Sequence, residues 1–497
     1  MTAEIDWAAL AVFLVLLGLV TALGFGAARW RRPKTLAHLE EWGLGGRQFG
    51  TWITWFLIGG DLYTAYTMIA VPALVYATGA FGFFAIPYAI LVYPFVFAVM
   101  PILWHVAKKN NHVTAADVVY GRYRYRPLEL AVAITGVIAT MPYIALQLIG
   151  IETVFHALGI KGELPLVAAF LILALNTYSA GLRAPALIAI VKDTLIYIVI
   201  LAAISLVPYK LGGYGAAFEA AGAAFNAKGS GGLLLSPVQY APYVSLALGS
   251  ALALFMYPHA VTGILASASA NTIRKNAMLL PAYSVALALI AVMGLMGHAA
   301  GLKLSNNNDV VPLLFKILFP GWFAGIAFAA IAIGALVPAA IMSIGAANLF
   351  ARNFWKAYIN PGVTALGEAR VAKMTSFAVV TGALLFILFL PTQFALDLQL
   401  LGGLWILQTL PAVIFGLYTG WFRAEGLLAG WVVGFLGGSW LAWLNGFKPL
   451  HTLHFGAASI TLYSGLLALA VNILVAILVS AVLRRAARGD RDLARAG

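Results

Sequence analysis

Charge and cysteine are what this 497-residue sequence lacks. Only 9% of its residues are charged and 63% are hydrophobic, whereas soluble domains carry about 25% charged residues. A water-exposed surface needs charge, so the deficit excludes an ordinary soluble domain and leaves lipid as the solvent. The absence of cysteine excludes disulfide bonds and thiolate metal sites.

Thirteen segments are apolar and long enough to span a bilayer, which takes about 20 residues per helix. They predict an all-α membrane protein. The first segment is followed by Arg29, Arg31 and Arg32. Positive charge after an apolar run, rather than before it, indicates a retained helix and not a cleaved signal peptide. The predicted transmembrane helices are 7–28, 51–77, 80–106, 128–158, 163–180, 186–209, 238–267, 276–300, 311–350, 371–391, 395–420, 425–445 and 459–483.

Lys and Arg are unevenly divided between the two sets of predicted loops. Short cytoplasmic loops are enriched in these residues, so the distribution predicts an N-terminus outside and a C-terminus in the cytoplasm. It also explains the net charge of +13 without nucleic acid as a partner. The basic tail after Arg484 is interpreted as a stop-transfer signal, with contact to anionic lipid as the alternative. Few basic residues fall on the outer side: Lys161, Lys210, Lys228, Lys303, Lys316 and Lys448.

Two predicted helices carry Gly, Pro and polar residues at mid-span, around 59–67 and 256–263. Irregular backbone within a membrane is tolerated where it is buried in protein or lines a cavity. Each of these helices begins a set of five, and an odd number of helices turns the second set upside down. The pattern is typical of inverted-repeat transporters, in which paired interruptions mark the substrate site. For either helix alone, an ordinary Gly/Pro kink is the alternative.

The domain organisation follows from these two sets. We expect an N-terminal extra helix with a cytoplasmic loop at 1–50, a first five-helix repeat at 51–210 and an extracellular loop at 211–237. A second, inverted five-helix repeat follows at 238–420. Two C-terminal helices and a cytoplasmic tail occupy 421–497.

Ionisable side chains within the predicted spans are candidates for function, because charges in lipid tend to face a cavity or each other. They include Asp61, Lys192, Asp193 and His259. Lys192 and Asp193 follow Pro185 by about seven residues, which places them about 10 Å along their helix. Lys192 either snorkels to the cytoplasm or has a functional role, whereas the shorter Asp193 is harder to explain by snorkelling.

Five segments of the sequence carry a family resemblance: 59–72, 181–194, 257–259, 339–343 and 348–353. Together they resemble the sodium:solute symporter (SSS) family. The resemblance covers nearly the whole chain, and within the family it points to the monocarboxylate permeases of bacteria and archaea. It implies an inverted-repeat (5+5), LeuT-like core with broken first and sixth core helices, in the cytoplasmic (inner) membrane.

The resemblance implies a cation site between the second and ninth predicted helices. Its ligands would be the backbone carbonyls of Gly60, Tyr63 and Ala340 and the hydroxyl of Ser343. Oxygen ligands suit Na⁺, which is a hard cation. Asp193 would match the acidic residue that assists ion release in the family.

One departure from the family pattern opens a second interpretation. The family commonly has another hydroxyl residue directly after the position of Ser343, where this chain has Ile344. In some proton-coupled transporters of the same fold, a lysine on the helix of Lys192 stands in for sodium, and a buried lysine can change its protonation state. The coupling cation is therefore left open between Na⁺ and H⁺. Asp61 and His259 are further candidates to carry a proton.

A small carboxylate needs N–H donors or a cation to replace the water that it loses. Broken helices offer free N–H groups at the N-termini of their halves, where the helix dipole favours anions. No arginine lies in a predicted mid-span, so backbone N–H groups, a histidine or a lysine are the expected partners. The predicted substrate-binding residues are Asp61, Tyr63, Thr64, Thr67, Gln147, Tyr257, His259, Thr262, Trp405 and Gln408.

The predicted function is cation-driven import of small monocarboxylates such as lactate, pyruvate or acetate, or of alanine, by alternating access. The alternative is symport of another small organic solute, such as an amino acid or a pantothenate-like acid. No HExxH motif and no nucleophile with a credible base is found, so no enzyme is predicted. A channel would need repeated charged or carbonyl rings. We expect a small organic anion and membrane lipid as partners, a monomer or loose oligomer, and no cofactor besides the coupling cation.

Overall fold

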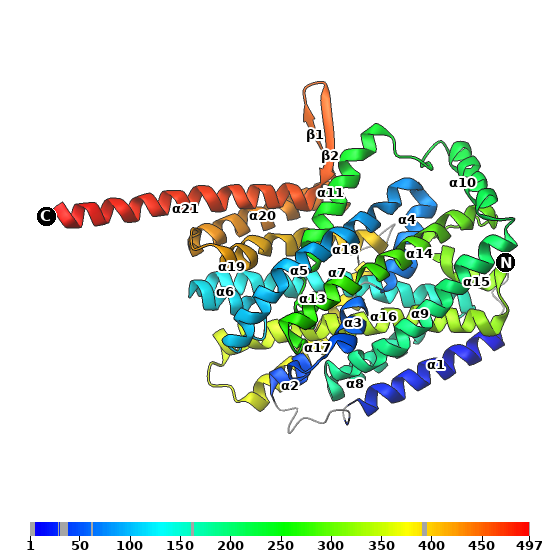
Figure 1. Ribbon diagram of the computed structural model, residues 1–497, viewed down its shortest axis with the longest axis horizontal. Coiled ribbons are helices and arrows are strands. Elements are labelled where there is room, and N and C mark those ends of the chain that lie inside the picture. Colours follow the sequence, from blue (N-terminus) through cyan, green and yellow to red (C-terminus); the bar gives the residue numbers. More distant parts are fainter. Residues whose placement is uncertain are drawn as a thin grey trace.

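The computed structural model describes residues 5–27, 29, 38–60, 63–160, 164–389 and 395–496. Most helices run side by side through one body (Figure 1). Within the described residues, nine helices are long and apolar enough to cross a membrane, or ten if a pair bent by 49° forms one span. The protein is thus a helical membrane protein, as its composition predicts.

The first predicted interruption is present in the structure. Helix α3 (Thr51–Gly60) ends at Gly60, and Tyr63 and Thr64 lie in a bend. A π-helical turn, η2 (Tyr66–Ala70), then leads into α4 (Val71–Thr78). Such π turns are frequent at functional sites. Asp61, which was predicted to bind substrate, lies outside the described residues.

The second predicted interruption is also present. Helix α11 (Pro237–Leu254) and helix α12 (Pro258–Ala266) are the pair bent by 49°. Tyr257 between them is extended, with φ −61° and ψ 141°. Pro258 starts α12, where its missing N–H leaves no helical hydrogen bond unmade.

Helix α16 lies at the centre of the packing. Of its apolar stretch, 94% is buried, and it contacts α7, α1, α9 and α17. Glycine permits the close approach of α12, because a methyl group at Gly345 would lie 2.8 Å from the backbone nitrogen of His259. Small residues at helix contacts have this effect in membrane proteins generally.

The other helices largely follow the predicted spans, and some of them differ in their bounds. The expected helix 311–350 is divided at Pro320, which cannot continue the preceding helix, and the expected loop 211–237 contains α10. Helices so far without bounds are α1 (Trp7–Gly26), α2 (Leu39–Leu44), α5 (Ala85–Lys109), α6 (Ala115–Tyr123), α7 (Arg126–Leu158), α8 (Leu164–Ala180), α9 (Arg183–Lys210), α10 (Tyr214–Lys228), α13 (Ala270–Leu279), α14 (Pro281–Ala299), α15 (Val310–Leu318), α16 (Gly321–Leu349), α17 (Ala365–Phe389), α18 (Ala395–Ile406), α19 (Gly416–Tyr418), α20 (Ala424–Leu444) and α21 (Ser464–Ala496). Short 3-10 or π segments are η1 (Gly45–Arg47), η3 (Ala80–Phe84), η4 (Asn307–Asp309), η5 (Phe350–Ile359), η6 (Leu407–Thr409) and η7 (Pro411–Phe415).

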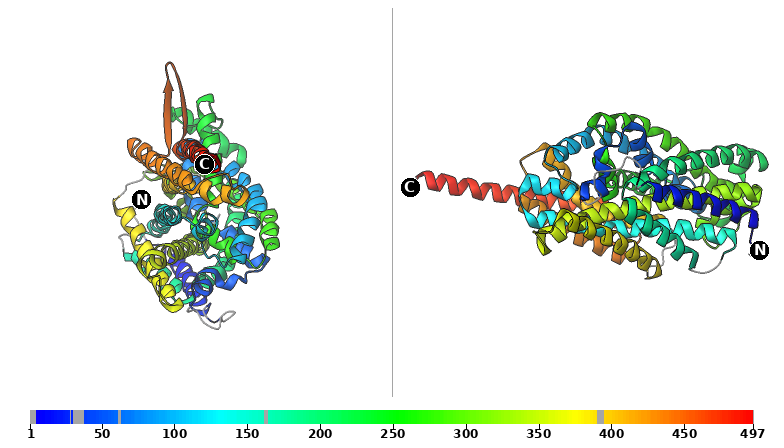
Figure 2. Two further views of the ribbon diagram at one scale, coloured as in Figure 1. Left: turned by 90° about the vertical axis from the view of Figure 1, so that its left-hand side faces the viewer. Right: turned by 90° about the horizontal axis from the view of Figure 1, so that it is seen from below.

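A β-hairpin precedes the last helix and projects from the helical body (Figure 1). Strand β1 (Leu450–Phe455) pairs antiparallel with β2 (Ala458–Tyr463). The segment is rich in β-branched and aromatic residues, which favour strands, and Gly456 takes a positive φ of 62° in the turn. Helix α21 therefore begins at Ser464, later than the expected start at 459, and carries the C-terminus beyond the body (Figure 2).

Candidate functional site

Lys192 on α9 reaches the end of the first broken helix. Its Nζ atom donates hydrogen bonds to the carbonyl oxygens of Gly60, at 3.1 Å, and Tyr63, at 3.0 Å. Both carbonyls lie where the helix stops, and helix ends leave carbonyls without a helical partner. The lysine side chain is fully buried, so it does not snorkel to the cytoplasm. The ammonium group contacts two of the four atoms predicted to bind a cation.

Asp193 and Tyr283 complete a buried group around this ammonium. Lys192 Nζ lies 2.8 Å from Asp193 Oδ1, an ion pair by distance whose angles are not those of a hydrogen bond. Tyr283 on α14 donates its hydroxyl to Asp193 Oδ2 at 2.7 Å. Buried charges persist when they are paired and hydrogen-bonded. The three side chains thus form one charge-compensated unit.

The remaining predicted cation ligands lie on α16. The hydroxyl of Ser343 donates to the carbonyl of Ala340 at 2.9 Å and lies 2.9 Å from the hydroxyl of Ser376 on α17. Ser343 and Ser376 are buried. In this structure these oxygens are therefore paired among themselves, while the carbonyls of Gly60 and Tyr63 are paired with Lys192.

Polar side chains also pair with the N–H groups that the first break exposes. Gln147 on α7 accepts a hydrogen bond from the backbone nitrogen of Ala65 at 3.0 Å. Thr64 accepts one from the backbone nitrogen of Tyr66 at 2.9 Å through its hydroxyl. Thr67, in η2, is buried beside them. Gln147 and Thr64, both predicted to bind substrate, therefore cap the broken backbone in this structure.

At the second break, an aromatic cluster surrounds His259. The rings of Tyr143 and Tyr257 lie 5.4 and 5.2 Å from its imidazole. Among the described residues, neither ring nitrogen of His259 has a hydrogen-bond partner, although the side chain is fully buried. The hydroxyl of Tyr257 donates to the carbonyl of Gln399 at 3.0 Å, and the buried side-chain amide of Gln399 likewise has no partner within the described part of the chain.

Leaving a buried polar group without a partner costs about 1–3 kcal/mol. The imidazole of His259 and the amide of Gln399 each meet that description. They are therefore candidates to hydrogen-bond with a ligand that enters the site.

A small tyrosine-lined cavity lies between residues that contact the two breaks. On one side it includes Tyr143, which contacts His259, and on the other Tyr283, which contacts Asp193. The hydroxyl of Tyr66 has no partner among the described residues. Sequence reasoning missed this cavity because its tyrosines come from different helices and form no motif. We name it the tyrosine cavity, lined by Tyr66, Tyr88, Ala89, Tyr93, Tyr143, Tyr283, Ser284 and Leu287.

None of the described residues predicted to bind substrate is among the residues that line the tyrosine cavity, and three of them have their contacts elsewhere. Thr262 lines a separate pocket beside α12. The indole of Trp405 donates to the hydroxyl of Ser439 on α20 at 3.0 Å. The amide oxygen of Gln408 accepts from Asn472 on α21 at 3.2 Å. Trp405 and Gln408 thus hold the α18 region against the two C-terminal helices.

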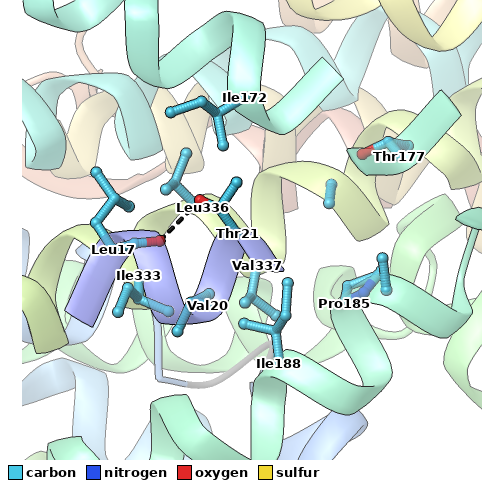
Figure 3. Close-up of a pocket in the computed structure, with 12 residues that line it drawn as sticks. Leu17, Val20, Thr21, Ile172, Thr177, Pro185, Ile188, Ile333, Leu336 and Val337 are labelled. Atoms are coloured by element: carbon cyan, nitrogen blue, oxygen red, sulfur yellow. Dashed lines mark hydrogen bonds between the residues drawn. The ribbon is translucent and has the colours of Figure 1, made fainter. Parts of the chain in front are cut away.

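An apolar pocket lies between α1, α8, α9 and α16 (Figure 3). Its walls are aliphatic side chains such as Leu17, Ile188 and Val337, and the hydroxyl of Thr21 is already bonded to the carbonyl of Leu17 at 2.7 Å. Among the described residues, no charged side chain lines this pocket. Its chemistry suits apolar material and not a carboxylate.

A polar cluster around Asn353 ties several helix ends together. The Asn353 amide donates to Asp117 at 2.7 Å and Glu129 at 2.8 Å and accepts from the hydroxyl of Thr114 at 2.7 Å. Arg126 forms a 2.7 Å ion pair with Glu129. Because these residues belong to the starts of α6 and α7 and to η5, the cluster holds three segments in one arrangement.

Comparisons with known proteins agree with this architecture. Residues 42–434 match the model of the sodium:solute symporter family. The chain is 69% identical over 483 residues to a monocarboxylate transport permease protein of Rhizobium johnstonii, covering 97% of this chain and 98% of that protein. It is 34% identical over 440 residues to an uncharacterized symporter of Bacillus subtilis, covering 86% of this chain and 87% of that one.

A solved structure shares the fold. It is a Na⁺-coupled sialic acid symporter in a substrate-bound outward-open state, with a TM-score of 0.77 and 15% identity over 96% of this chain and 98% of that one. The family resemblance seen in the sequence is confirmed. The chain belongs to the sodium:solute symporter family, and it is a cation-coupled transporter rather than an enzyme.

Proposed function

We propose that the chain imports small monocarboxylates together with a proton. The observation that carries the choice of proton is the bonding of Lys192 Nζ to the carbonyls of Gly60 and Tyr63. A sodium ion bound at the first break would need those same two oxygens. The positive charge at this site then belongs to the Lys192 side chain and not to a bound ion. It is present only while Lys192 is protonated.

The proton acts by holding α9 against the first break. When Lys192 is protonated, its ammonium bonds both carbonyls and is balanced by Asp193, as buried charges require. When the proton leaves toward the cytoplasm, the neutral amine is a weaker donor and the pairing with Asp193 is lost. The half-helix that ends at Gly60 is then free to move relative to α9, which is the change that alternating access needs.

The tyrosine cavity is the proposed substrate site. Its volume in this structure is about 10 Å³, room for about one water molecule, so the cavity must widen to admit a short carboxylate such as lactate, pyruvate or acetate, or the amino acid alanine. Tyr66 in its wall, and His259 and Gln399 at the second break, have hydrogen-bonding groups that lack partners within the described residues. The name of the Rhizobium johnstonii relative supports a monocarboxylate, and another small organic acid or amino acid is the alternative. Gln147, Thr64 and Thr67 would contribute from the first break.

The same proposal includes the topology. We take the chain to have thirteen spans, with inverted repeats at 51–210 and 238–420 and the N-terminus outside. The Asn353 cluster then lies at the cytoplasmic end, where it closes the path below the substrate site. The apolar face of the bundle is in lipid, as expected for a bacterial cytoplasmic membrane.

Uptake into proteoliposomes tests the proposal. Radiolabelled lactate or pyruvate should accumulate when an inside-alkaline pH gradient is imposed, and a protonophore should abolish the accumulation. A sodium gradient at equal pH should have no effect. Full drive by sodium with no response to pH would contradict the proton version.

A sodium-coupled version is the second candidate, and the Ser343–Ser376 contact of 2.9 Å supports it. Two neighbouring hydroxyls and the carbonyl of Ala340 are oxygen groups of the kind that Na⁺ prefers. In that case Ser343→Ala should lower sodium-driven uptake. Unchanged uptake by this variant would remove the candidate.

A further inference from the structure

Tyr283 contacts both the proposed cation site and the proposed substrate site. Its hydroxyl donates to Asp193 Oδ2 at 2.7 Å, and its ring forms part of the wall of the tyrosine cavity. Only 1% of the residue is exposed. Movement of the carboxylate and filling of the cavity therefore act on the same side chain.

The ring of Tyr283 also rests on the backbone of the first break. A methyl group at Gly59 would lie 2.0 Å from Cζ and 2.3 Å from the hydroxyl oxygen of Tyr283, so the ring fills the space that glycine leaves. The ring centroid of Tyr63 lies 4.5 Å from that of Tyr283. Glycine at position 59 permits this close approach, and Tyr283 touches the chain before and after the interruption.

We propose that Tyr283 is a positioning residue that links the proposed cation site, through Asp193, to substrate occupancy of the tyrosine cavity. Asp193 is paired with Lys192 through one oxygen and with the phenol of Tyr283 through the other, and the ring is held against Gly59 and Tyr63. When α9 moves relative to the first break during transport, the carboxylate moves with it and the bonded phenol follows. A substrate in the cavity restricts that movement. This inference rests on the proposed function.

The test separates coupling from transport itself. Exchange of labelled for unlabelled pyruvate at equal pH needs binding and alternating access but no net movement of protons, whereas accumulation under a pH gradient also needs coupling. Tyr283→Phe keeps the ring and removes the hydroxyl. We expect the ratio of accumulation to exchange to fall about tenfold or more, the scale of one hydrogen bond to a charged group, and the dependence of accumulation on external pH to flatten.

Two other tyrosines serve as controls. Tyr93 also lines the tyrosine cavity, but its hydroxyl lies 2.5 Å from Ser284 and not at Asp193. Tyr93→Phe should therefore change exchange and accumulation in parallel and leave their ratio constant. Tyr463 is a buried phenol outside the site that donates to the carbonyl of Leu400 at 2.5 Å, and Tyr463→Phe should leave the ratio at its wild-type value.

Gly59→Ala provides an independent variant. Its methyl group displaces the ring without removing the hydroxyl, and we expect the same fall in the ratio. A wild-type ratio in both Tyr283→Phe and Gly59→Ala would overturn the proposal, as would an equal fall in Tyr93→Phe. If Tyr283→Phe does not reach the membrane, Gly59→Ala decides alone.

The outcome for wild type distinguishes this inference from the proposed function. If accumulation responds to sodium and not to pH, proton coupling fails. The ratio is then measured under the sodium gradient, and a fall confined to Tyr283→Phe and Gly59→Ala would still support the link through Tyr283.

Discussion

The two broken helices differ in how completely their polar groups are paired. At the first break, Lys192 bonds the exposed carbonyls, and Gln147 and Thr64 accept from exposed N–H groups. At the second, the buried side chains of His259 and Gln399 lack partners within the described residues. The described backbone groups at the first break are therefore paired without a ligand and only side-chain capacity such as the hydroxyl of Tyr66 is left, whereas at the second the side chains of His259 and Gln399 keep hydrogen-bonding capacity. Under the proposed function, the first break serves the cation and shares the substrate cavity through Tyr66, and the second serves the solute.

This division has a physical origin. Charge at the first break is supplied by a side chain, so the broken backbone is stable in the absence of any bound ion. At the second break, Pro258 removes one N–H from the helix start, and the imidazole next to it has no partner among the described residues. Substitutions at the first break should thus reduce stability or coupling, and substitutions at the second should reduce affinity.

The largest effect is expected for Lys192→Ala. The variant leaves the carboxylate of Asp193 buried without its counterion, and breaking a buried pair by removing one partner costs about 3–5 kcal/mol. We expect a large fall in thermal stability in detergent and loss of uptake driven by the pH gradient. Lys192→Ala combined with Asp193→Asn removes both charges and should recover much of the stability but none of the coupling. Proton-driven uptake by either variant would contradict the role of Lys192.

A smaller effect, on affinity, is expected for His259→Phe. Phenylalanine keeps an aromatic ring between Tyr143 and Tyr257 but cannot hydrogen-bond with the substrate. The KM for pyruvate should rise about tenfold, the scale of one hydrogen bond to a charged group, while thermal stability is not lowered. The matched control is His105→Phe, because His105 already bonds the carbonyl of Pro101 at 2.7 Å on a different helix. A stability loss with unchanged KM would reverse the assignment of His259.

Two buried glutamines, one at each break, allow a direct comparison of stability. Gln147 accepts from the backbone of Ala65, whereas the side chain of Gln399 has no partner among the described residues. Gln147→Met should lower the free energy of unfolding by about 1–2 kcal/mol, because it leaves a buried N–H unpaired. Gln399→Met loses no such bond and should not lower it. Equal losses in thermal denaturation would show that the breaks do not differ as described.

Both breaks could be predicted from the sequence because their signals are local. Gly59 and Gly60 weaken one helix, and Pro258 ends the other, wherever the chain is folded. The depth of Lys192 also follows from counting residues along a helix. The direction of the Lys192 side chain could not be predicted in this way. Whether it bonds to Gly60 and Tyr63 or snorkels depends on how α9 packs against α3.

The tyrosine cavity could not be predicted for the same reason. Tyr66, Tyr143 and Tyr283 belong to separate helices, and their convergence is set by tertiary packing. Trp405 and Gln408 show the opposite error, a predicted contact with substrate that the structure does not place at the cavity. They are an aromatic and a polar residue near mid-span, but they face the C-terminal helices. Strand β2 was read as the start of a helix because its apolar residues run directly into those of α21.

The smallest effect is expected outside the spans, at Asp309 in η4, which packs against α4 and η2 after the first break. Burial raises the pKa of Asp309, and the nearby Glu152 adds to the rise while His156 opposes it. The folded protein therefore binds this proton more readily than the unfolded chain, and the stability contributed by protonation is lost as pH rises through the folded pKa. Asp309→Asn removes a carboxylate that is unfavourable above that pKa, so it should raise the melting temperature by roughly 1–2 °C at alkaline pH and have no effect in acid.

The control for this prediction is Glu219→Gln, at an exposed position on α10, which should not change the melting temperature at either pH. A variant that is less stable at both pH values would mean that the ionised Asp309 has a stabilising partner, and the segment after the first break would then depend on a second charge besides Lys192.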